Sequence, residues 1–441
     1  MDTFGNTQAK VVPLDLSENQ FQIYNKISRN YSHSFLFESL SGPEILAETS
    51  VMGFDPKIIF KGYSDKVEII ETNDPFVELK KLLGKSNDQK YRYLGGAVGV
   101  VNYDSIRLVE NISEEKNLTQ PIMEFGIYDD GLLYDNVVKK LFYFYHDVNR
   151  FDKLIMSNDS FDEFHSSEVT PNMDKEKFSN IVNKAKQYIH DGDIFQVVLS
   201  RKFAFETSGD NLTLYKTLRK LNPSPYMYHL KQDSKTIIGA SPEMLVRITD
   251  DKVETFPIAG TRKITDNEEK NKALSDELIH DEKELAEHTM LVDLGRNDIG
   301  RVCKYGTVHP ESLMEIKRFS HVQHIVSHVV GNLDSKNDMF DAFQAVFPAG
   351  TVSGAPKVRA MQIIDELEAE ERGPYAGAVG YFSYNGCCDF AIAIRSIFIE
   401  NNKGFVQSGA GIVSDSIAEN EFKETEHKAG AMLQALKEAS N

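Results

Sequence analysis

Runs of apolar residues predict several β-strands in the first third of the chain. The segments 35–40 (FLFESL), 57–63 (KIIFKGY) and 139–148 (KKLFYFYHDV) are rich in aromatic and β-branched residues. The segment 93–104 (YLGGAVGVVNYD) is rich in glycine and has strand-forming residues on both sides. Such residues fit the pleated, half-buried surface of a sheet. We expect this part of the chain to mix strands with helices.

Helical periodicity is clearest between residues 177 and 192. Gly192 stands where a C-terminal helix cap belongs. The apolar residues that fall on one side of this helix are Ile181, Val182, Ala185, Tyr188 and Ile189. The segments 267–294, which is long and charged, and 418–439 predict two further helices.

Strand patterns occupy most of the remaining chain. The segments 193–205 and 235–262 are typical of strands. The segment 377–413 alternates strongly and is interrupted at Asn385-Gly386, a dipeptide typical of hairpin turns. Because the strands follow one another as hairpins, we predict an α+β fold with large, mostly antiparallel sheets.

A polar stretch divides the chain into two parts. Residues 157–176 (SNDSFDEFHSSEVTPNMDKE) are acidic and nearly free of aliphatic side chains. This composition is typical of a linker. We expect it to separate an N-terminal region, residues 1–156, from a C-terminal domain, residues 177–437.

The composition excludes several classes of protein. The chain of 441 residues is 41% hydrophobic and has a net charge of −18, from 49 Lys and Arg against 67 Asp and Glu. It is therefore folded rather than disordered, and it offers no basic surface for nucleic acid. It has no apolar stretch near the roughly 20 residues of a membrane-spanning helix, and it starts without the features of a secretory signal. Three cysteines cannot form a disulfide framework, so we expect a cytoplasmic protein that binds neither nucleic acid nor membrane.

Two carboxylate pairs are candidates for chemistry, because common nucleotide, zinc-protease and serine-hydrolase motifs are absent. Glu284 and Glu287 are three residues apart, and so are Glu421 and Glu424. On a helix this spacing places each pair on one face. Each pair can be a solvated acidic face, or part of a site for Mg²⁺, which prefers few carboxylates, water and an anionic ligand.

Isolated polar residues lie within otherwise apolar strands. Gln196, Glu243 and Arg395 are the clearest examples. A buried arginine requires an anion, because an unpaired charge is costly away from water. These features together predict a small polyanionic substrate and a divalent cation.

Two glycine-rich segments can be tight turns or can bind an anion. The segment 348–361 (PAGTVSGAPKVRAM) places Lys357 and Arg359 directly after Pro356, where a helix is expected to begin. The segment 408–416 (SGAGIVSDS) is a second such loop. Free N–H groups at a helix start attract carboxylate or phosphate.

Long motifs between about 190 and 430 identify a family. They include GDIFQVVLSRKF, NPSPYMYHL, FPIAGTRK, DEKELAEHTMLVDLGRNDIGRV, HVQHIVSHVVG, GTVSGAPKVRAM, YAGAVGYFSY and QSGAGIVSDSIAENEFKET. On these residues the chain resembles the chorismate-utilising enzymes and, within them, anthranilate synthase component I, the large aminase subunit. The resemblance implies a sandwich-like core of large antiparallel sheets flanked by helices. It also implies a lyase that converts chorismate and ammonia into anthranilate and pyruvate in tryptophan biosynthesis.

The resemblance assigns a role to each candidate residue. It implies that Glu287 and Glu424 bind Mg²⁺ and that Glu284 and Glu421 are partners through water. Glu243 is implied to be the general acid that protonates the departing C4 hydroxyl group. Thr351 and His324 are implied to line the ring, with His324 acting in the elimination of pyruvate. The groups implied to hold the substrate carboxylates are Arg395, Tyr381, Lys428 and the backbone of Gly409, Ala410 and Gly411.

Two positions distinguish activities within the family. Relatives that add water to chorismate carry a lysine where this chain has Gln196, and an amide has no pKa near neutrality. Aminodeoxychorismate synthases carry a nucleophilic lysine where this chain has Ala259, followed by Gly260 and Thr261 in the implied substrate site. Direct addition of ammonia at C2 is therefore expected. Rival interpretations are an aminodeoxychorismate or aminodeoxyisochorismate synthase, and a non-catalytic subunit that binds chorismate or tryptophan.

The resemblance also implies a partner subunit and an inhibitor. Nothing in the chain resembles a glutamine amidotransferase, so a separate glutaminase subunit, anthranilate synthase component II, is expected to supply ammonia. Two segments resemble those that bind L-tryptophan in feedback-inhibited members, and their residues are Glu38, Ser39, Pro225, Tyr226 and Met227. Glu38 would bind the ammonium group, and Tyr226 and Met227 the indole. Alternatively, the first segment is only a core strand and the second only a turn.

Overall fold

Two large sheets form the centre of the protein. The computed structural model describes residues 8–15, 18–41, 48–67, 70–72, 74–88, 90–112, 118, 120–154, 160–319 and 322–441. Within these residues every pair of neighbouring strands in the two sheets is antiparallel. The α+β fold with mostly antiparallel sheets that the sequence predicts is confirmed.

The first sheet has the strand order β1-β10-β9-β3-β2-β14-β15-β24-β25-β13-β11, and β12 and β21 also pair with β13. Its strands are β1 Lys10–Leu14, β2 His33–Glu38, β3 Thr49–Phe54, β9 Asp130–Asp135, β10 Lys140–Tyr145, β11 Phe164–Ser166, β12 Thr170–Pro171, β13 Gln196–Gly209, β14 Tyr226–Gln232, β15 Lys235–Ser241, β21 Gly354–Ala355, β24 Ser396–Glu400 and β25 Lys403–Ile412.

The second sheet has the order β18-β20-β17-β16-β23-β22-β7-β8-β4-β5-β6, with β19 paired to β20. Its strands are β4 Ile58–Gly62, β5 Lys66–Val67, β6 Ile70–Glu71, β7 Gly96–Val101, β8 Met123–Tyr128, β16 Met244–Thr249, β17 Lys252–Thr255, β18 Ile258–Lys263, β19 His309–Arg318, β20 Val322–Asn332, β22 Ala378–Ser383 and β23 Cys388–Ile392.

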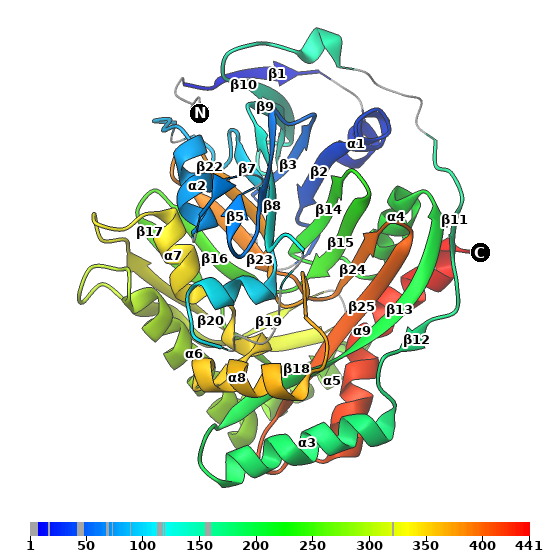
Figure 1. Ribbon diagram of the computed structural model, residues 1–441, viewed down its shortest axis with the longest axis vertical. Coiled ribbons are helices and arrows are strands. Elements are labelled where there is room, and N and C mark those ends of the chain that lie inside the picture. The colour runs from blue at the N-terminus through cyan, green and yellow to red at the C-terminus, as the bar shows by residue number, and fades with distance from the viewer. Residues whose placement is uncertain are drawn as a thin grey trace.

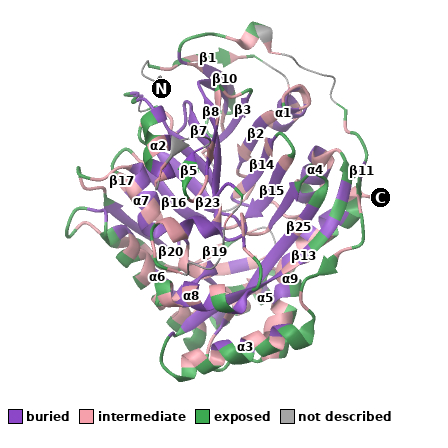
Figure 2. Cartoon of the chain, in the orientation of Figure 1, coloured by how far each residue is buried: buried purple, intermediate pink, exposed green. Residues whose placement is uncertain are grey.

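The helices lie around the strands (Figure 1). They are α1 Gln20–Ser28, α2 Pro75–Leu82, α3 Lys175–His190, α4 Asn211–Leu221, α5 Glu268–Leu278, α6 Glu282–Gly300, α7 Met339–Val346, α8 Lys357–Leu367 and α9 Ala418–Ala439, with short 3₁₀ turns at Tyr103–Leu108, Phe151–Lys153 and Gly350–Val352. Figure 2 shows that buried residues concentrate in the central strands, whereas α3 presents an exposed face. No helix in the described ranges is long and apolar enough to span a membrane.

Strands from both halves of the chain share each sheet. In the first sheet β2 of the N-terminal half pairs with β14, and in the second sheet β7 pairs with β22. The described part of the predicted linker, residues 160–176, forms β11 and β12 along β13, and its residues 157–159 lie outside the described ranges. The division into residues 1–156 and 177–437 stays a prediction.

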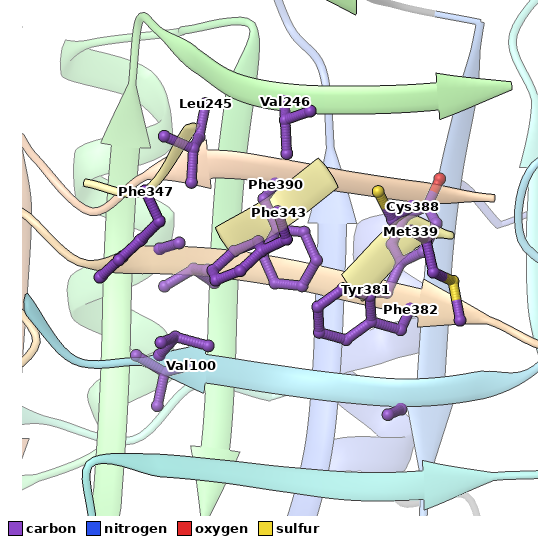
Figure 3. Close-up of a cluster of buried hydrophobic side chains, with 14 of the residues drawn as sticks. Val100, Leu245, Val246, Met339, Phe343, Phe347, Tyr381, Phe382, Cys388 and Phe390 are labelled. Carbon is purple, nitrogen blue, oxygen red and sulfur yellow. The ribbon is translucent and has the colours of Figure 1, made fainter. Parts of the chain in front are cut away.

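Aromatic side chains dominate the core beside the second sheet. Figure 3 shows α7 packed on β22 and β23, where Phe343 lies against Phe390 with ring centroids 4.8 Å apart. Phe340 stacks on Phe382 at 4.3 Å. Such contacts add stability beyond the burial of apolar area. This core fixes β23, and Arg395 lies in the turn that follows this strand.

One predicted helix is in fact two helices. The segment 267–294 divides into α5 and α6, because Asp281 caps the second helix by accepting hydrogen bonds from the backbone N–H groups of Lys283 and Glu284. The end of α5 is closed by a bond from the Ile279 N–H to the Ser275 carbonyl. A side-chain cap satisfies N–H groups that have no partner within the helix, so it favours a helix start at this point.

Candidate active site

The candidate catalytic and metal-binding residues of the C-terminal half lie where the two sheets and two helices meet. In the lower half of Figure 1, α6 packs against β18 and β20, and α9 packs against β25, which lies beside β13. These elements come from distant parts of the chain. Their contacts decide which of the predicted residues can act together.

Glu243 has the environment of a general acid. It directly precedes β16, it is 8% exposed, and its Oε1 accepts a hydrogen bond from Thr351 Oγ1 at 2.9 Å. Burial raises the pKa of Glu243 to about 8, against the opposing effects of the Thr351 hydrogen bond and the charge of Lys428. At neutral pH the carboxyl group therefore holds a proton that it can donate.

Arg395 is a cation without a fixed counter-ion. It adopts φ +51° in the turn between β23 and β24, and no described residue forms a side-chain hydrogen bond or ion pair with it. Burial lowers the pKa of Arg395, while Tyr375 and Glu424 nearby favour its charged form. An arginine in such a place favours binding of an anion.

The tyrosine near Arg395 is Tyr375, which the sequence analysis missed. A Cβ atom placed on Gly409 would lie 2.9 Å from the Tyr375 hydroxyl oxygen. Tyr381, which was predicted to hold the substrate carboxylates, instead lines a separate pocket with Glu38. That prediction is wrong in this structure. Both tyrosines belong to one motif, YAGAVGYFSY, and strand alternation alone does not show which of them reaches Arg395.

The glycine segment at 408–416 is largely a strand rather than a loop, because β25 continues to Ile412. Lys428 on α9 donates to the carbonyl of Gly409 at 3.0 Å and pairs with Glu424 at 2.7 Å. A Cβ atom on Gly411 would lie 2.7 Å from Gln196 Nε2, so glycine gives the amide room. The side chain of Ala410 packs in the core, so Ala410 can offer only its backbone.

Of the two interpretations left open for the segment 348–361, the structure does not support binding of an anion by its two cations. Lys357, at the start of α8, is paired with Asp298, and Arg359 is paired with Asp193 at 2.5 Å. Both cations are therefore already compensated. What brings this segment into the site is Thr351, through its hydrogen bond to Glu243.

The four carboxylates lie on two helices, as the spacing predicts. Glu287 accepts a hydrogen bond from Gln196 Nε2 at 3.2 Å, and Glu284 pairs with Arg262 of β18 at 3.1 Å. Burial raises the pKa of Glu287, and the charges of Glu284 and Glu424 raise it further. Burial and Glu424 also raise the pKa of Glu421. In the described part of the chain no three His, Cys, Asp or Glu side chains gather closely enough to hold a metal ion.

The donor set nevertheless fits a hard divalent cation. Glu284 pairs with Arg262 and Glu424 pairs with Lys428, whereas Glu287 and Glu421 have no ion-pair partner among the described residues and have raised pKa values. Oxygen ligands are those that Mg²⁺ prefers. A cation placed among these carboxylates would remove their repulsion.

His324 is held by a bulge in β18. The register of β18 shifts between Ala259 and Arg262, and Gly260 adopts φ +64° there. His324 Nδ1 lies 2.8 Å from the Gly260 carbonyl and 3.1 Å from Thr261 Oγ1. Because a carbonyl only accepts, Nδ1 carries the proton and Nε2 of the neutral ring is able to accept one. Burial lowers the pKa of His324, which favours this neutral form.

Comparisons with known proteins show the family of this chain. A family model described as chorismate binding enzyme matches residues 13–434. The chain belongs to the chorismate binding enzyme family. It is 44% identical to anthranilate synthase component 1 of Acetivibrio thermocellus, over 92% of this chain and 90% of the relative. It is 39% identical to aminodeoxychorismate synthase component 1 of Bacillus subtilis, over 97% of this chain and 96% of the relative.

A solved structure of the same family shares the fold. The crystal structure of anthranilate synthase component I from Streptococcus pneumoniae TIGR4 aligns with a TM-score of 0.80 at 39% identity, covering 88% of this chain and 92% of that chain. The sandwich-like core predicted from the resemblance agrees with this likeness. In this chorismate binding enzyme, Glu243 lies near Lys428 and Arg395 lies near Glu424, and Lys428 and Glu424 form one ion pair.

This family member has a second pocket, between the two sheets. All five residues of the predicted tryptophan site line it, because β2 and β14 are neighbours and Met227 faces Glu38 in the register. Tyr226 donates to Asp389 at 2.9 Å, and Asp389 pairs with Arg247 at 2.7 Å. The second sheet thus supplies the polar wall of the pocket.

The expected role of Glu38 in this pocket is not supported. Its carboxylate accepts hydrogen bonds from Arg219 at 2.6 Å and 3.0 Å and from Tyr215 at 2.7 Å. It is thus already compensated and is not free to bind an ammonium group. Ser39 Oγ, in contrast, is buried and has no hydrogen-bond partner among the described residues.

Proposed function

We propose that this protein converts chorismate and ammonia into anthranilate and pyruvate, as the large subunit of an anthranilate synthase in the cytoplasm. Two observations carry the proposal: Arg395 is a partly buried cation without an ion-pair partner among the described residues, and burial raises the pKa of Glu243 to about 8. Chorismate is a dicarboxylate whose C4 hydroxyl group leaves in the reaction. It needs both a cation and an acid.

In the proposed first step, ammonia adds at C2 and the C4–O bond breaks. Arg395 holds a substrate carboxylate, with the Tyr375 hydroxyl beside it. Lys428, to which the resemblance gives the same role, would have to exchange its ion pair with Glu424 for a substrate carboxylate. Glu243 gives its proton to the departing hydroxyl group, which leaves as water. The Thr351 hydroxyl donates to the other oxygen of Glu243 and fixes the direction of this proton.

In the proposed second step, the aminated intermediate loses pyruvate. His324 Nε2 accepts the proton from C2, and the C3–O bond breaks as the ring becomes aromatic. The enolpyruvyl group gains a proton and leaves as pyruvate. The bond from Nδ1 to Gly260 keeps the ring in the tautomer that this step requires.

Mg²⁺ is proposed as the cofactor. Glu287 and Glu424 would bind it directly, and Glu284 and Glu421 would do so through water. When bound, the ion supplies positive charge for a substrate carboxylate in a protein whose net charge is −18. The raised pKa values of Glu287 and Glu421 support a cation at this place.

Ammonia as the nucleophile is supported by Gln196 and Ala259. The Gln196 amide donates to Glu287, so it lies inside the site yet cannot deprotonate water. The buried Ala259 precedes the Gly260 bulge and offers no amine for a covalent intermediate. Ala259 therefore disfavours the aminodeoxychorismate synthase activity that one relative's name describes.

A glutaminase subunit and feedback by L-tryptophan complete the proposal. The names of the relatives call them component 1, which implies a further component. A glutamine amidotransferase would supply the ammonia. The pocket of Ser39 and Met227 would bind tryptophan, with the free hydroxyl of Ser39 as a polar contact.

The purified chain tests the proposal directly. With chorismate, Mg²⁺ and ammonium it should form fluorescent anthranilate, and with glutamine in place of ammonium it should not. Product chromatography separates this outcome from release of an aminated intermediate. Robust glutamine-dependent turnover by the chain alone, or the absence of anthranilate with ammonium, would contradict the proposal.

A further inference from the structure

Helix α6 contacts both sheets through one face. Glu287 accepts a hydrogen bond from Gln196 of β13 in the first sheet, and Glu284 forms an ion pair with Arg262 of β18 in the second. His288 is fully buried, with Nε2 2.7 Å from Ser327 Oγ of β20. Positions 284, 287 and 288 share a face of the helix. The histidine therefore fixes the same surface that presents the two carboxylates.

Strand β20 uses its two faces for different purposes. Gln323 contacts α5 through the Asn271 carbonyl at 2.9 Å, and Ser327 contacts α6. Between them, His324 contacts the Gly260 carbonyl of β18. Successive residues of a strand point to opposite faces, so Gln323 and Ser327 share one face and His324 lies on the other. One face of β20 thus anchors helices while the other carries the candidate base.

Ser327 stands at a junction of strands. One edge of β20 pairs with β18 as far as Val326 and with β17 from Val329 onward, and the Ser327 N–H donates to the Pro257 carbonyl between them. Its hydroxyl also accepts from the N–H of Met314, which has φ +54° in β19. A single hydroxyl group therefore connects α6 to the strands around it.

Packing alone does not explain a histidine at position 288. Its Nδ1 is buried and has no hydrogen-bond partner among the described residues. An unpaired buried polar atom costs free energy, and leucine would fill this place without that cost. The role of the His288 ring must therefore lie in the hydrogen bond between its Nε2 and Ser327 Oγ.

We propose that His288 and Ser327 are positioning residues that set α6, with its carboxylates, relative to β20, with His324. This inference rests on the proposed function, because it concerns the groups assigned there. Without the hydrogen bond between His288 Nε2 and Ser327 Oγ, α6 can shift relative to β20. A misplacement of about 1 Å between reacting groups costs on the order of 100-fold in rate.

The test compares His288→Leu, His288→Gln and Ser327→Ala with the wild type. The measurements are kcat and KM with chorismate and ammonium, Mn²⁺ affinity by electron paramagnetic resonance, and Tm. His288→Leu should lower kcat on the order of 100-fold and weaken Mn²⁺ binding, with Tm unchanged or raised. In His288→Gln the amide can still bond to the Ser327 hydroxyl, so this variant should keep most of the wild-type kcat and Mn²⁺ affinity. Ser327→Ala should change kcat and Mn²⁺ affinity in the same direction as His288→Leu.

A second buried histidine provides the matched control. His229 is 2% exposed, its Nδ1 contacts Tyr24, and its Nε2 has no partner among the described residues. His229→Leu should change Tm without changing kcat or Mn²⁺ affinity. If His288→Leu has the wild-type kcat and Mn²⁺ affinity, the inference is wrong. If that variant does not fold, a wild-type kcat in Ser327→Ala overturns the inference equally. Wild-type protein that makes no anthranilate would refute the proposed function instead.

Discussion

At the scale of single residues, Glu243 owes its chemistry to burial. An exposed glutamate is ionised at pH 7, whereas burial raises the pKa of Glu243 to about 8. The acid form is the one that the reaction needs. We expect kcat/KM, measured at constant free NH₃, to fall as the pH rises through about 8. A profile that stays flat through this range would show that Glu243 is not the proton donor.

Replacing Glu243 by glutamine tests the same residue without changing its size. The amide still accepts the hydrogen bond from Thr351 but has no proton of suitable acidity. We expect kcat to fall by about 10²- to 10⁴-fold, the range of general acid catalysis. Circular dichroism and Tm should stay near those of the wild type, and an active Glu243→Gln enzyme would exclude the assignment.

Gln196 tests the choice of nucleophile. A lysine at this position would lie beside the Glu287 carboxylate, whose charge favours the protonated amine and opposes its action as a base. We therefore expect Gln196→Lys to form only small amounts of isochorismate or salicylate from chorismate without ammonia. Chromatography of the products measures this, with Gln196→Met as control. If Gln196→Lys forms no hydroxylated product while binding chorismate normally, Gln196 does not select the nucleophile.

At the scale of elements, the start of α6 positions two carboxylates. Asp281 caps α6 and pairs with Arg262 at 3.0 Å. Asp174 caps α3 by accepting from the Lys177 N–H, and α3 carries no candidate site residue. Each Asp→Ala change should cost about 1 kcal/mol of unfolding free energy in urea. Only Asp281→Ala should also lower kcat, and an equal kcat in both variants would contradict the assigned role of α6.

At the scale of the whole molecule, the second pocket joins the two sheets. It contacts Arg247 on β16, the strand that Glu243 directly precedes. A ligand that shifts the two sheets relative to each other can therefore change the position of Glu243 through β16. We expect L-tryptophan to inhibit anthranilate formation and to change its own fluorescence on binding, because the chain contains no tryptophan.

Ser39→Phe supplies the matching variant for the pocket. A larger side chain at position 39 should fill the space beside Met227. It should abolish both the inhibition by L-tryptophan and the change in tryptophan fluorescence, while turnover without tryptophan stays at the wild-type rate. The fluorescence titration and the activity assay should change in parallel. Wild-type protein that shows neither effect at millimolar tryptophan would rule out the site.

Acid stability is a second property of the whole fold. Burial lowers the pKa of His229 from 6.5 to about 3, so the unfolded chain binds a proton there that the folded protein does not bind. The unfolding free energy should therefore decrease as the pH falls from about 6.5 toward 3. Urea unfolding between pH 7 and pH 4 measures this slope, which should be smaller in His229→Gln. An equal slope in both proteins would contradict this origin of acid sensitivity.

Local patterns in the sequence were sufficient for many elements. The helix ending near Gly192 forms α3, and Gly192 has φ +85°, which a helix cap of this kind uses. The hairpin at Asn385-Gly386 joins β22 and β23, with φ +84° at Gly386. The spacing of three also places Glu284 and Glu287 on one helix, as expected. These features depend on neighbours within a few residues, so the sequence determines them without the rest of the fold.

Contacts between distant residues were decided only by the tertiary structure. Thr351 donates to Glu243 across 108 positions of the sequence, and no periodicity relates the two. Tyr375 rather than Tyr381 reaches Arg395, because the packing of whole strands determines which tyrosine faces the site. Glu38 pairs with Arg219 instead of remaining free. Burial and charge pairing depend on every element packed around a residue, and the order of residues along the chain does not contain that information locally.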